Sequence, residues 1–149
     1  YMARNGYRVF DSDMHVYDAH DLYEKYMNPR WGERIPVGTK RTKHGRIEFS
    51  LGSGEVLRKR SKLLEHGEDK VADRYGYALE RTYDAPSQVV AMDKEGIDVA
   101  VLFPTVCLYI PNGLNDVSGN LSAAGCRAYN NWLYDFCSCV FNFNFQFLT

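Results

Sequence analysis

The most constraining stretch of the sequence is an apolar run near its start, Val9 to Val16, which carries Asp11, Asp13 and His15 at alternate positions. In an extended strand, residues two apart share one face. Two carboxylates and an imidazole on one strand face need solvent or a cation, because burying unpaired charge is costly. Asp oxygen and His nitrogen suit Zn²⁺, with Mn²⁺ and Fe²⁺ as alternatives, so the pattern predicts a divalent-metal site. The competing interpretation is a strand end that enters a solvated loop, with an Asp capping the next segment.

The composition indicates an ordinary globular domain and excludes several classes of partner. The chain has 149 residues, 45% of them hydrophobic, and a net charge of -1. The balanced charge offers no electrostatic footprint for nucleic acid or an anionic membrane. No apolar stretch reaches the roughly 20 residues that a membrane span needs, and the first residues lack a signal-peptide core. We therefore expect a cytoplasmic protein whose four cysteines are reduced core thiols: Cys107, Cys126, Cys137 and Cys139.

The two ends of the sequence predict a fragment of a longer protein. Residue 1 is Tyr and precedes Met2, and the chain stops in an apolar run without a polar ending.

Periodicity predicts helices and short strands in the first two thirds of the chain. A short helix is expected over 19–27, with His20 at its start in a surface or capping role. Turn signals between 38 and 59 separate short alternating runs, which predict two or three small antiparallel strands. Basic residues there are interleaved with acidic ones, which favours a solvated surface. A helix is expected from Asp84, a good N-cap before Pro86, to Gly96, a good stop.

The last third continues the alternation of strand and helix. Residues 97–103 are apolar on both faces, as in a buried parallel strand, and 104–113 form a proline-bounded loop suited to a pocket wall. A long helix is expected to begin at about 118–120, with an apolar and aromatic stripe that continues to Phe136. Residues 140–147 alternate with period two, as a next strand or an exposed aromatic edge. This order predicts an α/β fold. A (β/α)8 TIM barrel takes about 250 residues, so the chain would hold its N-terminal part, with a small β-rich insertion.

Three blocks of the sequence resemble the amidohydrolase-related (amidohydrolase 2) metal-dependent hydrolases, a family that includes carboxylate decarboxylases. The blocks occur in the family's order and cover most of residues 8–138: Asp11 to Tyr26, Met92 to Thr105, and Cys126 to Leu133. The resemblance implies a distorted (β/α)8 barrel over 8–138, with 38–83 as a peripheral insertion and 139–149 as an off-pattern, truncated end. By position it implies that Asp13 and His15 bind the catalytic metal, zinc or manganese. The remaining ligands and the catalytic residues are expected beyond Thr149.

The resemblance also implies a function, without deciding between two reactions. The full-length parent would be a metal-dependent hydrolase or a non-oxidative decarboxylase, since both use the same ligands on the first strand. The apolar loop 104–111, with Tyr109, favours a small aromatic or hydrophobic carboxylic substrate. The expected partners are that substrate and, for the full-length protein, further copies in a homo-oligomer. The alternative is a non-catalytic α/β module or interaction protein, and the 149-residue chain alone is expected to be inactive.

Overall fold

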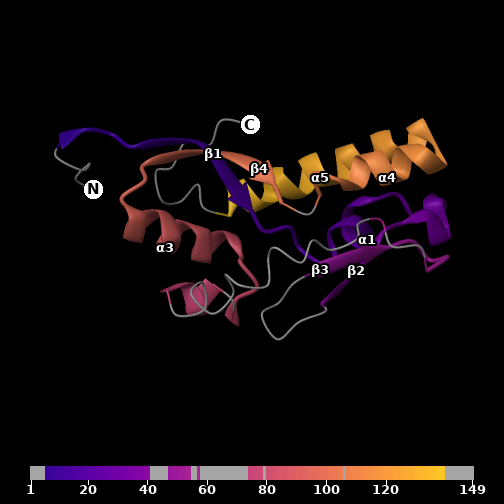
Figure 1. Cartoon of the computed structure of the whole chain (residues 1–149), viewed down its shortest axis with the longest axis horizontal. Coiled ribbons are helices and arrows are strands. Elements are labelled where there is room, and N and C mark those ends of the chain that lie inside the picture. The colour runs from indigo at the N-terminus through magenta and orange to yellow at the C-terminus, as the bar shows by residue number, and fades with distance from the viewer. Residues whose placement is uncertain are drawn as a thin grey trace.

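The computed structural model describes residues 6–40, 47–54, 57, 74–78, 80–105 and 107–139. The predicted strand at 140–147 lies outside these ranges, as do the off-pattern end at 139–149 apart from Cys139 and most of 55–73. Figure 1 shows the arrangement of the elements, with an additional helical turn at 74–78. In chain order they are β1 (Phe10–Val16), α1 (Leu22–Tyr26), the 3-10 helix η2 (Pro29–Arg34), β2 (Val37–Lys40), β3 (Ile47–Ser50), α3 (Ala85–Glu95), β4 (Val99–Pro104), α4 (Ile110–Val117) and α5 (Gly119–Ser138).

The central pair of strands is parallel, as the sequence predicted. β1 and β4 lie side by side, and the chain returns from one to the other through α3 (Figure 1). Outside this pair, β2 and β3 form an antiparallel hairpin. The result is a mixed α/β fold with a small parallel sheet. Within the described ranges that sheet has two strands, so a closed barrel is not seen there.

A one-residue slip in the ladder changes which side chains of β1 share a face. The slip falls between Asp11 and Met14, where β1 has one more residue than β4. An extra residue reverses the alternation beyond it. His15 therefore pairs with Phe103, which is exposed, whereas Asp11 pairs with Ala100, which is buried. The expectation that all three polar side chains share one face is wrong for Asp11.

Helix α3 begins and ends where its local signals predicted. The Asp84 carboxylate accepts a hydrogen bond from the Ser87 backbone N–H at 3.0 Å, and Pro86 occupies the first turn. At the other end Gly96 is left-handed, with a φ of 71°, and its N–H bonds back into the last turn. The helix covers one face of the sheet, where the Gln88 amide contacts the Met14 sulfur at 3.0 Å.

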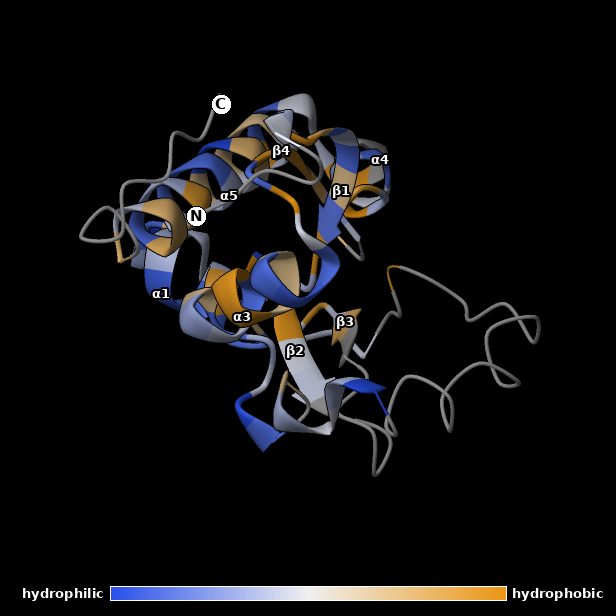
Figure 2. Ribbon diagram, turned by 90° about the vertical axis from the view of Figure 1, so that its left-hand side faces the viewer, coloured by the Kyte–Doolittle hydropathy of each residue, from blue (hydrophilic) through white to orange (hydrophobic). Residues whose placement is uncertain are grey.

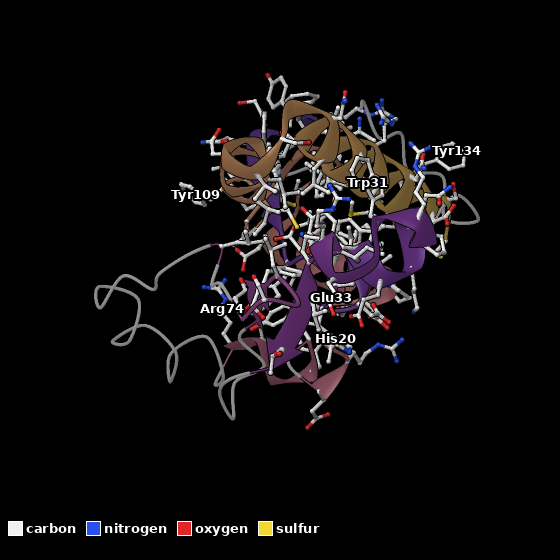
Figure 3. All side chains as sticks on the ribbon, turned by 90° about the vertical axis from the view of Figure 1, so that its right-hand side faces the viewer. His20, Trp31, Glu33, Arg74, Tyr109 and Tyr134 are labelled. Atoms are coloured by element: carbon white, nitrogen blue, oxygen red, sulfur yellow. The ribbon has the colours of Figure 1, made fainter. Side chains whose placement is uncertain are left out.

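The region expected to be a loop over 104–113 is partly helical. Residues 110–117 form α4. Pro111 is compatible with this helix because it lies in the first turn, where its missing N–H removes no intrahelical hydrogen bond. Tyr109 at its N-cap points outward and is 46% exposed (Figure 3). Helix α5 begins where predicted, after Ser118, whose hydroxyl accepts from the Leu121 N–H at 3.1 Å, and it runs to Ser138. None of the helices in the described ranges is both long and apolar enough to cross a bilayer.

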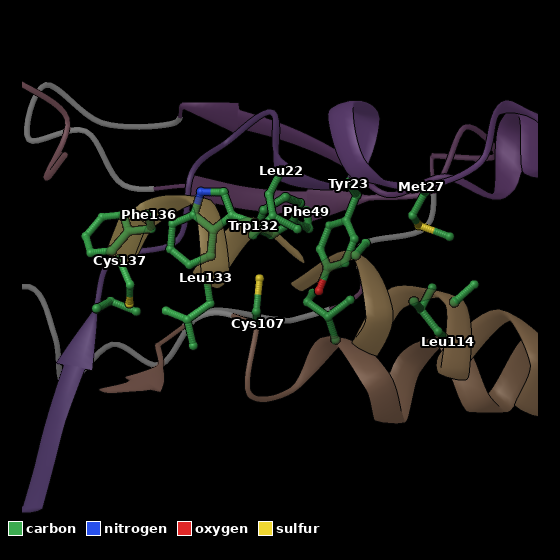
Figure 4. Close-up of a cluster of buried hydrophobic side chains, with 14 of the residues drawn as sticks. Leu22, Tyr23, Met27, Phe49, Cys107, Leu114, Trp132, Leu133, Phe136 and Cys137 are labelled. Carbon is green, nitrogen blue, oxygen red and sulfur yellow. The ribbon is translucent and has the colours of Figure 1, made fainter. Parts of the chain in front are cut away.

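The core lies between α1, the β2–β3 hairpin and the last two helices (Figure 4). Figure 2 colours the ribbon by hydropathy, and its helices carry both apolar (orange) and polar (blue) residues. The prediction of core thiols is confirmed for Cys107 and Cys137, but Cys126 and Cys139 are exposed. The largest fully buried apolar side chains are Tyr23, Phe49, Leu22, Met92, Ile110, Leu114, Leu121 and Val16.

The described part of segment 38–83 contributes more to the core than its sequence indicated. Phe49 is fully buried and meets Tyr23 edge-on, with ring centroids 5.2 Å apart. Leu51 is also buried. Gly38 lies so close to the connection before α1 that a Cβ there would be 2.0 Å from the His20 carbonyl oxygen. As a division of the chain into domains, the insertion at 38–83 stays a prediction.

Candidate metal centre

Asp13 and His15 lie in the C-terminal half of β1, beside the neighbouring strand β4. The Asp13 Oδ1 atom is 4.0 Å from the His15 Nε2 atom, so the two side chains converge. Both are accessible: the Asp13 side chain is 81% exposed and that of His15 46%. The sequence therefore predicted correctly that the two residues lie on a parallel strand with their side chains close together, and their role as metal ligands stays a prediction.

The His15 ring is held in one orientation by β4. Its Nδ1 atom is 2.8 Å from the carbonyl oxygen of Pro104. Because a carbonyl only accepts hydrogen bonds, Nδ1 must carry the proton. In the neutral ring Nε2 then bears the lone pair, and Nε2 is the atom nearest Asp13. Metal-binding histidines are commonly oriented in this way by a second hydrogen bond.

The two atoms are close enough to share one ion after a small side-chain adjustment. Zinc lies about 2.0 to 2.2 Å from carboxylate oxygen and imidazole nitrogen, and tetrahedral geometry brings two such ligand atoms to about 3.4 Å, somewhat closer than the 4.0 Å seen here. A catalytic zinc site takes three protein ligands and leaves one position for water. Among the described residues, no group of three or more His, Cys, Asp or Glu side chains converges. Asp13 and His15 thus fit two places of such a site.

The third polar residue of the pattern, Asp11, shapes the backbone instead. Its carboxylate Oδ1 accepts a hydrogen bond from the Asp13 N–H at 2.9 Å, across the slip in the ladder. Asp side chains commonly hold the backbone two residues on in this way. Asp11 therefore helps to set the bend that carries Asp13, a role that alternation in the sequence could not reveal.

A pocket of about 220 Å³ lies next to His15. Its lining residues include three tyrosines: Tyr17 after β1, Tyr75 from the turn at 74–78, and Tyr83 before α3. The Tyr17 and Tyr83 rings are stacked, with centroids 4.6 Å apart and planes 25° apart. The other lining residues are Ala78, Ser87, Gln88, Ala91 and Thr105.

This pocket differs from the one the sequence suggested. From loop 104–111, Thr105 lines it, and its hydroxyl donates to the Val16 carbonyl at 2.7 Å. Tyr109, the aromatic residue that the sequence favoured for this wall, does not line it. Tyr75 and Tyr83 belong to the connection before α3, whereas Tyr17 follows β1, so the crossover brings them together and their convergence carries no local sequence signal.

A buried carboxylate supports the loop that follows β4. Asp18 is 1% exposed, and its Oδ2 atom accepts from the Cys107 N–H at 3.1 Å. Burial, with the nearby Asp18 carboxyl, raises the pKa of the Cys107 thiol. Burial and the contact with Cys107 likewise raise the pKa of Tyr23. The raised pKa keeps the Cys107 thiol protonated, and thiol reactivity requires the thiolate, so Cys107 has a structural role.

The fold and site together define an α/β protein in which a carboxylate–imidazole pair and a tyrosine-lined pocket meet at the end of a parallel strand. No protein-family model matches the sequence. No curated protein matches it either.

A solved structure is similar in fold, namely that of an amidohydrolase from Mycobacterium avium subsp. paratuberculosis K-10. The two superpose with a TM-score of 0.57 at 20% sequence identity. The match covers 87% of this chain and 38% of the amidohydrolase. At this identity the likeness concerns the fold, and the chain spans well under half of the solved protein.

Proposed function

We propose that Asp13 and His15 are two ligands of a divalent metal, Zn²⁺ or alternatively Mn²⁺, in a metal-dependent hydrolase or non-oxidative decarboxylase. The hydrogen bond from His15 Nδ1 to the Pro104 carbonyl carries this proposal, because it turns the basic Nε2 atom toward Asp13. The fold shared with an amidohydrolase supports it. Since the chain spans 38% of that structure, the activity is proposed for a protein that also supplies the remaining ligands.

The proposed substrate is a small aromatic carboxylate or a related ester or lactone. The bound ion would polarise its carbonyl or carboxylate as a Lewis acid. Asp13 and His15 would hold the ion, the Pro104 carbonyl keeps the imidazole oriented, and the tyrosine-lined pocket would receive the ring. Hydrolysis and decarboxylation make the same demand on these residues, so either reaction is compatible with them.

Metal binding by the purified chain tests the proposal. We expect the 149-residue chain to bind Zn²⁺ weakly, because two ligands leave the ion under-coordinated. Asp13→Ala or His15→Ala should each weaken that binding by at least about tenfold, whereas His20→Ala, the matched control, should not. The measurement is competition with a chromogenic chelator, with Mn²⁺ in parallel. Equal affinities for wild type and all three variants would contradict the assignment.

The reaction is tested on a protein extended through the remaining strands. With metal added, it should turn over members of a panel of aromatic carboxylates or lactones, and release of CO₂ separates decarboxylation from hydrolysis. The same Asp13 and His15 variants should abolish turnover. Metal-independent turnover, or none by a protein that binds metal stoichiometrically, would contradict the proposed enzyme and favour the non-catalytic module.

A further inference from the structure

We propose that Tyr83 sets the size limit of the substrate in the pocket beside His15, admitting one aromatic ring and excluding two fused rings. The carboxylate part of this inference rests on the proposed function. The size limit rests on the backbone, the ring stack and the volume of the pocket.

Tyr83 has an unusual backbone that the preceding turn does not explain. Thr82 and Tyr83 both have left-handed φ values, 55° and 56°. The Tyr83 N–H bonds to the Ala78 carbonyl at 2.7 Å, the pattern by which a helix closes with one left-handed residue. That motif explains the left-handed backbone of Thr82. It leaves Tyr83 in a conformation that residues with large side chains rarely adopt, and such strain is concentrated at functional sites.

The consequence of this backbone is the position of the Tyr83 ring. The ring stacks on Tyr17, which follows β1 two residues after His15, and both line the pocket. Because the two rings are already in contact, they form one wall and cannot hold a ligand between them. Small side chains, Ala78 and Ala91, contribute to the rest of the lining. Tyr83 is thus the bulky group whose removal would enlarge the pocket toward the turn at 74–78.

The volume indicates which ligands the wall admits. Sites for drug-sized ligands occupy roughly 300 to 1,000 Å³, and this pocket is smaller, at about 220 Å³. A benzoate-like molecule, with on the order of ten non-hydrogen atoms, suits that space. Its carboxylate would face His15, and its ring would lie among the tyrosines and alanines. A second fused ring would extend toward the Tyr17–Tyr83 wall, which is where we propose that larger acids are excluded.

Ligand binding by the 149-residue chain tests this inference without requiring turnover. Benzoate and 2-naphthoate are titrated in the presence of Zn²⁺ and followed by NMR. Wild type should prefer benzoate. Tyr83→Gly should shift the affinity ratio toward 2-naphthoate by about tenfold, a typical effect of altered pocket size. Glycine suits the left-handed backbone, so the variant should fold, and Tyr83→Asn, which tolerates the same φ, is the second enlarging variant.

Two control variants distinguish the effect of the Tyr83 ring from the effect of the left-handed backbone. Thr82→Gly relaxes the neighbouring left-handed residue, which does not line the pocket, and should leave the ratio unchanged. Tyr83→Phe keeps the ring and should keep the preference for benzoate. An unchanged ratio in both enlarging variants, or no binding of either acid to any form, would overturn the inference. If the ratio shifts while Asp13→Ala has no effect on metal binding, the metal assignment fails and the role of Tyr83 stands.

Discussion

Several short acidic side chains in this protein bind backbone N–H groups. Asp11, Asp18, Asp84 and Asp98 each accept from an N–H, and the last of these joins the start of β1 to that of β4 through Val9 at 2.8 Å. Such hydrogen bonds satisfy backbone donors at strand irregularities, at helix starts and in connections, where regular backbone pairing is incomplete. Asp13 differs, because its carboxylate is largely exposed and faces an imidazole. This contrast distinguishes the candidate ligand from its structural neighbours.

The Asp84 cap gives a prediction at the residue scale. Burial acts to raise the pKa of Asp84, but hydrogen bonds from Arg81 and Ser87 outweigh it, so the pKa is lowered. A lowered pKa stabilises the fold above about pH 4, and this contribution is lost as the pH falls through the lowered value. At pH 7, Asp84→Ala should lower the free energy of unfolding by about 1 kcal/mol.

Urea denaturation measures this effect, with Asp84→Asn as the control that keeps an oxygen acceptor at the cap. Asp84→Asn should cost less than Asp84→Ala at pH 7. Its difference from wild type should shrink toward pH 3, where the wild-type carboxylate becomes protonated. A wild-type advantage that grows on acidification would be the wrong sign for this explanation.

Between elements, close backbone contacts and one side-chain bridge fix the packing around α1. The Tyr26 hydroxyl on α1 donates to the Asp135 carboxylate on α5 at 2.8 Å, and burial together with this bond raises the pKa of Tyr26 to about 12. On the other side of α1, Gly38 of β2 lies against the His20 backbone. The hairpin can approach this closely because position 38 has no side chain.

Gly38→Ala is therefore expected to destabilise the protein by about 3 kcal/mol. The new Cβ would stand 2.0 Å from the His20 carbonyl oxygen, and a backbone group cannot move aside as a flexible side chain can. The matched control is Gly76→Ala, because that position is helical and has nothing within 4 Å of the new Cβ. It should be stabilising, by up to about 1 kcal/mol. Thermal unfolding compares the two, and equal effects would refute the close contact.

At the scale of the whole molecule, two features bear on the proposed barrel: the exposed face of the β1–β4 pair and the buried residues of the β2–β3 hairpin. By register, His15, Phe10 and Phe103 share one face of the sheet, and both phenylalanines are exposed. Parallel sheets are usually covered on both faces. In the proposed barrel this face would turn inward, which places His15 where such enzymes carry their site.

Phe49→Ala tests whether segment 38–83 is part of the core. Phe49 is fully buried against Tyr23, so its truncation should cost about 3 to 5 kcal/mol. Val37→Ala, on the partly exposed strand β2, is the control and should cost about 0.5 kcal/mol. Chemical denaturation of both variants gives the comparison. A loss below about 1 kcal/mol for Phe49→Ala would restore the peripheral insertion as the better description.

Local signals in the sequence were sufficient for much of the fold. The Asp84 cap and Gly96 stop gave the bounds of α3, and three- and four-residue spacing gave α5. The apolar, β-branched residues of 97–103 predicted β4 as a buried parallel strand, and it pairs with β1. Period-two spacing also placed Asp13 and His15 together at the strand end. These features depend on residues within a few positions of one another, so they can be predicted from the chain alone.

The tertiary structure decided the features that depend on distant residues. The slip that turns Asp11 away arises from pairing with β4, and the proton on His15 Nδ1 is assigned by a carbonyl 89 residues later. The tyrosine wall likewise joins Tyr17, just after β1, to Tyr83, just before the N-cap of α3. Register and crossover geometry set these contacts, because a one-residue change in pairing moves a side chain to the opposite face. The sequence determined which residues could form the site, and the pairing of β1 with β4 determined which of them face it.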